Sequence, residues 1–155
     1  MSNSHNVSFF TKSTGLIINS GSKSDDVLWV RCIKDTGKKD NKGNGIWEKP
    51  SQGEGKVFSL SLKEQLQLLR VLENKMPKFS GFHSYKKGDT EIKTQFSFAW
   101  AKNKDNTGDI VWVNVDAYAI PLNGVDVELM RRLLDHIITE KIEFSTVPKE
   151  KDEGK

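Results

Sequence analysis

The sequence predicts an α+β fold made of two copies of one unit, a four-strand antiparallel sheet followed by a helix (ββββα-ββββα). Two observations support this prediction. A strand pattern runs without a loop into a helix pattern at 55–75, and the same succession returns at 109–141. The residues expected to cap the two helices, Ser61 and Asn123, lie 62 positions apart, about half of the predicted ordered core. We therefore interpret the chain as a doubled unit.

Alternation of apolar and polar residues predicts the four strands of the first unit. They are expected at 16–18, 27–34, 46–49 and 57–60. The segment 35–45, between the second and third of these strands, is rich in lysine, glycine and asparagine. That composition is typical of a hairpin loop, so we expect this segment to stand outside the core.

The first helix has the clearest start signal in the chain. Ser61 and Glu64 have the spacing of a capping box, in which each side chain accepts a hydrogen bond from the other residue's backbone amide. Pro77 cannot continue a helix, so the helix is expected to end near Lys75. Its apolar face is formed by Leu62, Leu66, Leu69 and Leu72 (or Val71).

The second unit repeats the order of the first. Strands are expected at 79–85, 91–102 and 110–115, with a short fourth strand leading to Pro121. A helix should follow over 124–141, where apolar residues recur at helical spacing. Asn123 can accept from the first turn of this helix, and Asp126 adds a negative charge that the helix dipole favours.

The composition divides the chain into one domain and two polar ends. Residues 1–14 are expected to be a loose N-terminal arm, although the pair Phe9-Phe10 is unusual in such an arm and could dock on the body. Residues 15–144 form the predicted domain, with repeat units at about 15–76 and 77–144. The charged segment 145–155 is expected to be a disordered tail.

Charge is distributed unevenly along the sequence. The net charge is only +3, yet residues 31–104 hold 16 Lys/Arg against 8 Asp/Glu, whereas residues 105–155 hold 6 against 11. The basic excess falls on most of the predicted strands, which favours a polyanionic partner over a merely solvated face. A single cysteine, Cys32, fits a reducing compartment and is expected in the core. No apolar run is long enough to cross a membrane, so no membrane partner is expected.

Signals of catalysis are missing from the sequence. Its three histidines, His5, His83 and His136, do not stand at metal-ligand spacing from one another. The glycines fall in turns and form no phosphate-binding loop ahead of a helix, and no serine lies in a nucleophile context. We therefore expect a non-enzymatic protein without catalytic residues, metal or cofactor. His83 could contact a base or a phosphate, but a half-buried strand histidine is the favoured interpretation.

Aromatic residues alternate with cations on several predicted strands, the combination with which proteins bind single-stranded nucleic acid. Some aromatics must instead form the core, because the helices have to cover one face of the sheet; for Phe58, Phe96, Phe98 and Trp100 we favour that role. Trp29 and Trp47 remain open to either role. The predicted nucleic-acid-binding residues are Trp29, Arg31, Lys38, Lys39, Lys42, Trp47, Lys49, Tyr85, Lys86, Lys87 and Lys93.

Two segments carry a resemblance to a known superfamily. Lys56-Val-Phe-Ser-Leu-Ser61 leads into the first helix and Tyr118-Ala-Ile-Pro-Leu122 leads into the second. With the doubled four-strand-plus-helix order, they resemble the plant Whirly proteins, whose superfamily includes the kinetoplastid mitochondrial RNA-binding proteins and the transcriptional coactivator positive cofactor four. The resemblance covers about residues 15–144. It implies a Whirly-like fold, single-strand binding with little sequence preference, and self-association as a dimer or tetramer through the helix faces.

The sequence departs from the plant proteins in two respects. It has no counterpart of their lysine-glycine-lysine-alanine motif, and it has no organellar transit peptide. We therefore expect a bacterial or bacteriophage protein of the bacterial or infected-host cytoplasm. The predicted function is single-stranded DNA binding in replication, recombination, repair or transcription. A single-stranded RNA binder and a protein-interaction module remain the alternatives, because ring stacking does not distinguish DNA from RNA.

Overall fold

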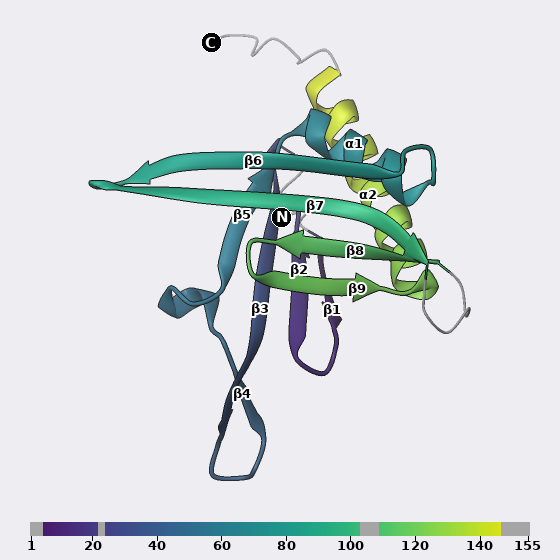
Figure 1. The fold of residues 1–155 in the computed structure, drawn as a ribbon. Helices are drawn as coiled ribbons and strands as arrows, with labels where there is room; N and C mark the ends of the chain where they lie inside the picture. Colours follow the sequence, from purple (N-terminus) through teal and green to yellow (C-terminus); the bar gives the residue numbers. More distant parts are fainter. Residues whose placement is uncertain (1–4, 22–23, 103–108, 147–155) are drawn as a thin grey trace, which may run out of the picture.

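The computed structural model describes residues 5–21, 24–102 and 109–146. Two antiparallel sheets lie against each other so that the strands of one run across the strands of the other, and two helices pack together at one end (Figure 1). This arrangement confirms the predicted α+β class and the two successive sheet-plus-helix units.

The first sheet is built around one long strand. Its strands are β1 (Asn6–Phe10), β2 (Thr14–Asn19), β3 (Leu28–Lys39), β4 (Gly45–Trp47) and β5 (Lys56–Leu60), with a short 3-10 turn, η1 (Pro50–Gln52), between the last two. The central β3 pairs with β2 on one side. Its other side is shared by β5, beside residues 28–32, and by β4, beside residues 35–39. Since β5 pairs only with β3 among the described strands, β5 leaves one backbone edge free.

The expectation of a loose N-terminal arm is wrong for the residues that form β1. Asn6–Phe10 pairs antiparallel with β2 and adds a fifth strand to the predicted four. Burial explains the pairing, because Phe9 is 4% exposed and Val7 packs against the same core. Phe10, on the other face, is 58% exposed. The sequence suggested that this pair could dock on the body, and both rings contact it, Phe9 in the core and Phe10 on the outer face against Trp47.

The second sheet is a simple antiparallel succession in chain order. It consists of β6 (Lys78–Lys87), β7 (Thr90–Lys102), β8 (Asp109–Val115) and β9 (Tyr118–Leu122). The β6–β7 hairpin is paired over ten positions and closes in a tight turn, where Gly88 adopts a positive φ of 64°. This hairpin extends past the first sheet (Figure 1). The predicted strands are therefore confirmed, and β6 is longer than expected.

The helices begin where the sequence predicts. In α1 (Leu62–Leu72), Ser61 Oγ accepts from the Glu64 amide and Glu64 Oε1 accepts from the Ser61 amide, at 3.3 and 2.9 Å. In α2 (Gly124–Thr146), Asn123 Oδ1 accepts from the Asp126 amide at 2.9 Å. Within the described segments, no helix combines the length and the apolar character that crossing a bilayer requires.

The helix ends differ from the predictions. α1 stops at Leu72, three residues early, because the chain turns through Asn74 in a left-handed conformation with a φ of 60°. α2 continues past residue 141 to Thr146, so Ser145 and Thr146 are helical and do not belong to the predicted tail. The remainder of that tail, 147–155, lies outside the described residues.

The core is shared between the two sheets. Phe58 of the first sheet stacks on Phe96 of the second at a centroid distance of 4.7 Å, and Phe98 is fully buried beside them. Trp100 packs against this core and donates its Nε1–H to the Val71 carbonyl at 2.5 Å. These four aromatics therefore have the core role that the sequence favoured. Cys32 is also buried, and burial, with a smaller contribution from the Asp116 charge, raises its pKa to about 12.

Candidate nucleic-acid interface

A cleft opens where the β6–β7 hairpin passes the free edge of β5. It has a volume of about 360 Å³ and takes its walls from both sheets. The residues that line this aromatic cleft are Trp29, Val57, Phe58, Ser59, His83, Ser84, Tyr85 and Thr94. Such a concave site, mostly apolar with a few polar groups, is typical of ligand binding by proteins.

Two exposed rings line the aromatic cleft. Trp29 points to the outer face of β3, because its neighbours Leu28 and Val30 occupy the core face, and its side chain is 38% exposed. Tyr85 comes from the hairpin and is 51% exposed. Both rings were predicted to bind nucleic acid, and the crossing of the sheets brings them to one site. Each ring is exposed enough to stack against a planar ligand.

His83 also lines the aromatic cleft, and two contacts hold its ring in place. Its Nε2 lies 2.8 Å from Glu64 Oε2, the second oxygen of the carboxylate that caps α1. The imidazole also lies 5.2 Å from the ring of Phe96, centroid to centroid. Sequence analysis favoured a half-buried strand role for His83, and the structure shows both that burial and a place in the cleft. The sequence did hold a signal for this place in the cleft: His83 and Tyr85 are two residues apart on one strand, so their side chains lie on the same face.

The second predicted tryptophan lies on the same outer face but further along the sheet. Trp47 is half-buried, packs edge-on against Phe10 at 5.5 Å and pairs across the strands with Asp35. Asp35 is six residues beyond Trp29 on β3, a distance of about 20 Å along a strand. Arg31, half-buried, lies between them on that face. The outer face thus carries a line from Trp29 through Arg31 to Trp47.

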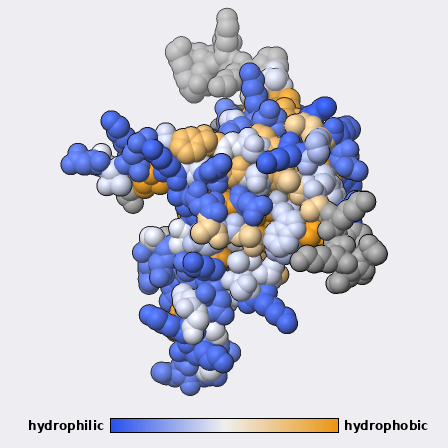
Figure 2. Space-filling model, viewed as in Figure 1, coloured by the Kyte–Doolittle hydropathy of each residue, from blue (hydrophilic) through white to orange (hydrophobic). Residues whose placement is uncertain are grey.

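The lysine-rich hairpin stands apart from the aromatic cleft. Lys38 and Lys39 are the last residues of β3, so the expectation that they belong to a loop is wrong, and the turn itself is shorter and contains Lys42. All three lysines are exposed, as is Lys49 just after β4. Figure 1 shows this hairpin projecting from the body, and Figure 2 shows its hydrophilic surface. Lys38 is nine residues from Trp29, or about 30 Å along β3.

The remaining predicted cations lie at the end of the β6–β7 hairpin. Lys86 pairs with Glu91, and Lys93 pairs with Ser84, which places both lysines on the face opposite Tyr85. Both are exposed, and Lys93 Nζ is 3.8 Å from a Glu91 carboxylate oxygen. Lys87 ends β6, and its side chain lies outside the described part of the chain. Lys86 and Lys93 therefore lie on the hairpin that forms one wall of the aromatic cleft, and neither of them lines the cleft.

An ion pair that sequence analysis missed fixes the hairpin beside β5. Lys56 Nζ donates to Asp116 Oδ2 at 2.9 Å and to the Lys93 carbonyl at 2.8 Å. Burial raises the pKa of Asp116, but hydrogen bonds from Lys56 and the Gln95 amide outweigh burial and keep that pKa below its usual value. Lys56 is thereby engaged between the sheets, and this contact holds the geometry of the cleft.

Comparison with known proteins gives a result at the level of the fold. No protein-family model matches the sequence, and no curated protein matches it either. Among solved structures, the chain is similar to Trypanosoma brucei MRP1/MRP2, with a TM-score of 0.57 and 12% identity over 94% of this chain and 89% of that one. It is also similar to a guide-RNA-binding protein complex bound to a guide RNA, with a TM-score of 0.56 and 12% identity over 94% and 95% of the two chains.

These similarities agree with the architecture described above. They extend over nearly all of each chain, so the match includes both sheets and both helices and is not confined to a single hairpin. The resemblance noted in the sequence implied a fold of this kind. The chain therefore has the Whirly-like fold of the MRP1/MRP2 proteins.

Proposed function

We propose that this protein binds single-stranded nucleic acid with little sequence preference and has no enzymatic activity. The observation that carries the proposal is that Trp29 and Tyr85, two exposed rings from different sheets, line one cleft, while exposed lysines stand on the two hairpins. Stacking of an unpaired base on an aromatic ring contributes roughly 1–3 kcal/mol per base and tolerates any base. The similarity in fold to a complex bound to guide RNA supports the same ligand class.

The path of the strand follows from the positions of these side chains. Bases enter the aromatic cleft and stack on both Trp29 and Tyr85. The strand then follows the outer face past Arg31 to Trp47, a length of about 20 Å that three or so nucleotides can span. Lysines of the two hairpins neutralise phosphates at either end. A duplex cannot bind in this way, because its bases are already stacked and paired.

DNA and RNA remain two candidates for the ligand. Sequence analysis predicted single-stranded DNA, and the guide-RNA complex among the structural neighbours favours RNA. Nothing in ring stacking involves the 2′-hydroxyl group, so we propose that both are bound and that contacts outside the cleft set the preference.

The first experiment compares nucleic acids of one length. Fluorescence anisotropy with labelled single-stranded DNA, single-stranded RNA and duplex DNA of about 30 nucleotides should show tighter binding of both single strands than of the duplex. Tryptophan fluorescence should be quenched in parallel, because bases stack on indole rings. If neither single strand binds at low salt, the proposal is wrong and a protein-interaction module becomes the better interpretation.

The lysine-rich hairpin has a separate and measurable role. Replacing Lys38, Lys39 and Lys42 by glutamine should weaken binding and flatten its salt dependence. For single strands, the slope of log K against log salt should fall by about 0.7 for each lysine that neutralises a phosphate. The control replaces two exposed cations away from the hairpin, Lys75 just after α1 and Arg132 on α2, by glutamine. An unchanged slope in the hairpin variant would exclude the hairpin from the interface.

Self-association through the helices is part of the same proposal. Val125 and Leu129 of α2 are 78% and 49% exposed, and they stand one turn apart on the helix. Apolar side chains exposed in this way favour contact with a second copy, as the sequence resemblance implied. A dimer or tetramer would place several aromatic clefts on one strand and increase the overall affinity.

A further inference from the structure

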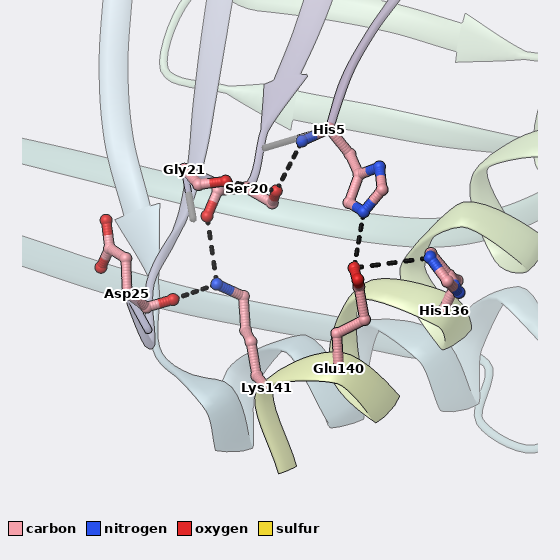
Figure 3. A network of polar contacts seen from close by, with 7 residues as sticks. All are labelled: His5, Ser20, Gly21, Asp25, His136, Glu140 and Lys141. Atoms are coloured by element: carbon pink, nitrogen blue, oxygen red, sulfur yellow. Dashed lines mark hydrogen bonds and ion pairs between the residues drawn. The ribbon is translucent and has the colours of Figure 1, made fainter. Parts of the chain in front are cut away.

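Two histidines and a glutamate from opposite ends of the chain meet beside α2. His5 immediately precedes β1, whereas His136 and Glu140 lie on α2 (Figure 3). Their ligating atoms all lie within 4.8 Å of one another. His136 and Glu140 are four residues apart, so they share one face of the helix, and β1 brings the third group to that face. None of the three takes part in the proposed nucleic-acid interface.

We propose that His5, His136 and Glu140 form a binding site for a divalent transition-metal ion of the zinc class. Two imidazoles and one carboxylate are the protein ligands of a common three-residue zinc set, which leaves the fourth position for water. Imidazole nitrogens favour zinc and similar ions over magnesium or calcium, which prefer oxygen.

The distances fit such an ion after a small adjustment. Zinc bonds of about 2.0–2.1 Å in a tetrahedron place neighbouring ligand atoms about 3.4 Å apart. His136 Nε2 and Glu140 Oε1 are 3.4 Å apart already. His5 Nε2 and Glu140 Oε1 form a hydrogen bond at 2.5 Å, which has to open by about 0.9 Å to admit the ion. The two imidazole centroids are 5.0 Å apart with the rings edge to face, so both can turn a nitrogen toward one point.

The backbone around the cluster is held in place on both sides. The His5 amide donates to Ser20 Oγ at 2.9 Å, and the His5 carbonyl accepts from the Ser20 amide at 3.0 Å. On α2, the residue after Glu140 is the buried Lys141, whose Nζ donates to the carbonyls of Ser20 and Asp25 (Figure 3). Because Ser20 touches both His5 and Lys141, the strand and the helix that carry the ligands are fixed to each other. A preorganised frame of this kind favours metal binding.

The test uses the untagged full-length chain after removal of metals with a chelator. Calorimetric titration with Zn²⁺ should show one ion bound per chain with a micromolar or tighter Kd, and Mg²⁺ should not compete. Zn²⁺ at a hundred times Kd should raise Tm by roughly 5–10 °C.

Three variants locate the ion. Glu140→Gln, His136→Gln and His5→Gln should each weaken Zn²⁺ binding at least tenfold and reduce the shift in Tm. His136 is 58% exposed, so its variant keeps the fold and separates loss of the site from loss of structure. His83→Gln is the matched control, since His83 also pairs with a glutamate, and it should bind Zn²⁺ normally. If the wild-type chain binds no Zn²⁺, or if Glu140→Gln and His136→Gln bind it as the wild type does, the cluster is only a His–Glu ion pair and the proposal is wrong.

Discussion

Replacing Trp29 and Tyr85 together by alanine is expected to weaken single-strand binding by about a hundredfold. Each ring contributes roughly 1–3 kcal/mol of stacking per base, and every 1.4 kcal/mol is a factor of ten. Stability should change little, because both rings are substantially exposed and neither belongs to the buried core. Anisotropy with single-stranded DNA and RNA measures the affinity, and thermal unfolding measures the stability.

A matched control separates stacking from general loss of aromatic surface. Phe82 lies on the same hairpin as Tyr85, three residues earlier, with 60% exposure on the opposite face. Phe82→Ala should therefore leave the affinity unchanged. The pair Trp29→Phe with Tyr85→Phe retains two rings and should restore most of the binding. Retention of wild-type affinity in the double alanine variant would show that the cleft does not hold bases.

Phe96→Ala is expected to cost about 3–5 kcal/mol of the free energy of unfolding. Phe96 is 1% exposed and contacts Phe58 of the other sheet as well as Phe79 and Phe98 of its own. Its truncation leaves a cavity at the junction of the two sheets, where no single strand can move to fill the space. Tm should fall by roughly 6–20 °C for a chain of this length.

Denaturant unfolding gives the free energy directly, and Phe82→Ala again provides the control. That substitution removes the same number of atoms from a solvent-exposed site, so it should change stability by less than about 0.5 kcal/mol. A loss below about 1 kcal/mol in Phe96→Ala would mean that the stacked pair of Phe58 and Phe96 does not join the sheets energetically.

Local sequence signals account for most of the fold. Apolar and polar residues alternate with period two in the strands. The capping box of Ser61 and Glu64 is a local signal that marks the start of α1. β1 was missed because it is short and lies in a polar terminal segment; Val7 and Phe9 favour a strand, and pairing with β2 and burial of Phe9 stabilise it. The end of α1 was misplaced because Asn74 takes a left-handed conformation directly after the helix, and an asparagine at this position was the available stop signal.

The candidate site was predictable only in part. Strand alternation showed that Trp29 could face outward, but it gave no distance from Trp29 to Tyr85, because that distance depends on how one sheet crosses the other. Alternation also could not show that the lysine-rich hairpin and the cleft lie at different places along β3. The meeting of His5 with Glu140 was invisible for the same reason, since the two residues stand at opposite ends of the chain.

The free edge of β5 has a consequence for the behaviour of the protein at high concentration. An unpaired edge offers backbone donors and acceptors to any passing strand, and edge-to-edge pairing of this kind starts aggregation. Here the β6–β7 hairpin passes close to that edge and, through Lys56, is tied to the strand that it shields. The β6–β7 hairpin that forms one wall of the aromatic cleft thus also hinders other chains from pairing with the free edge of β5.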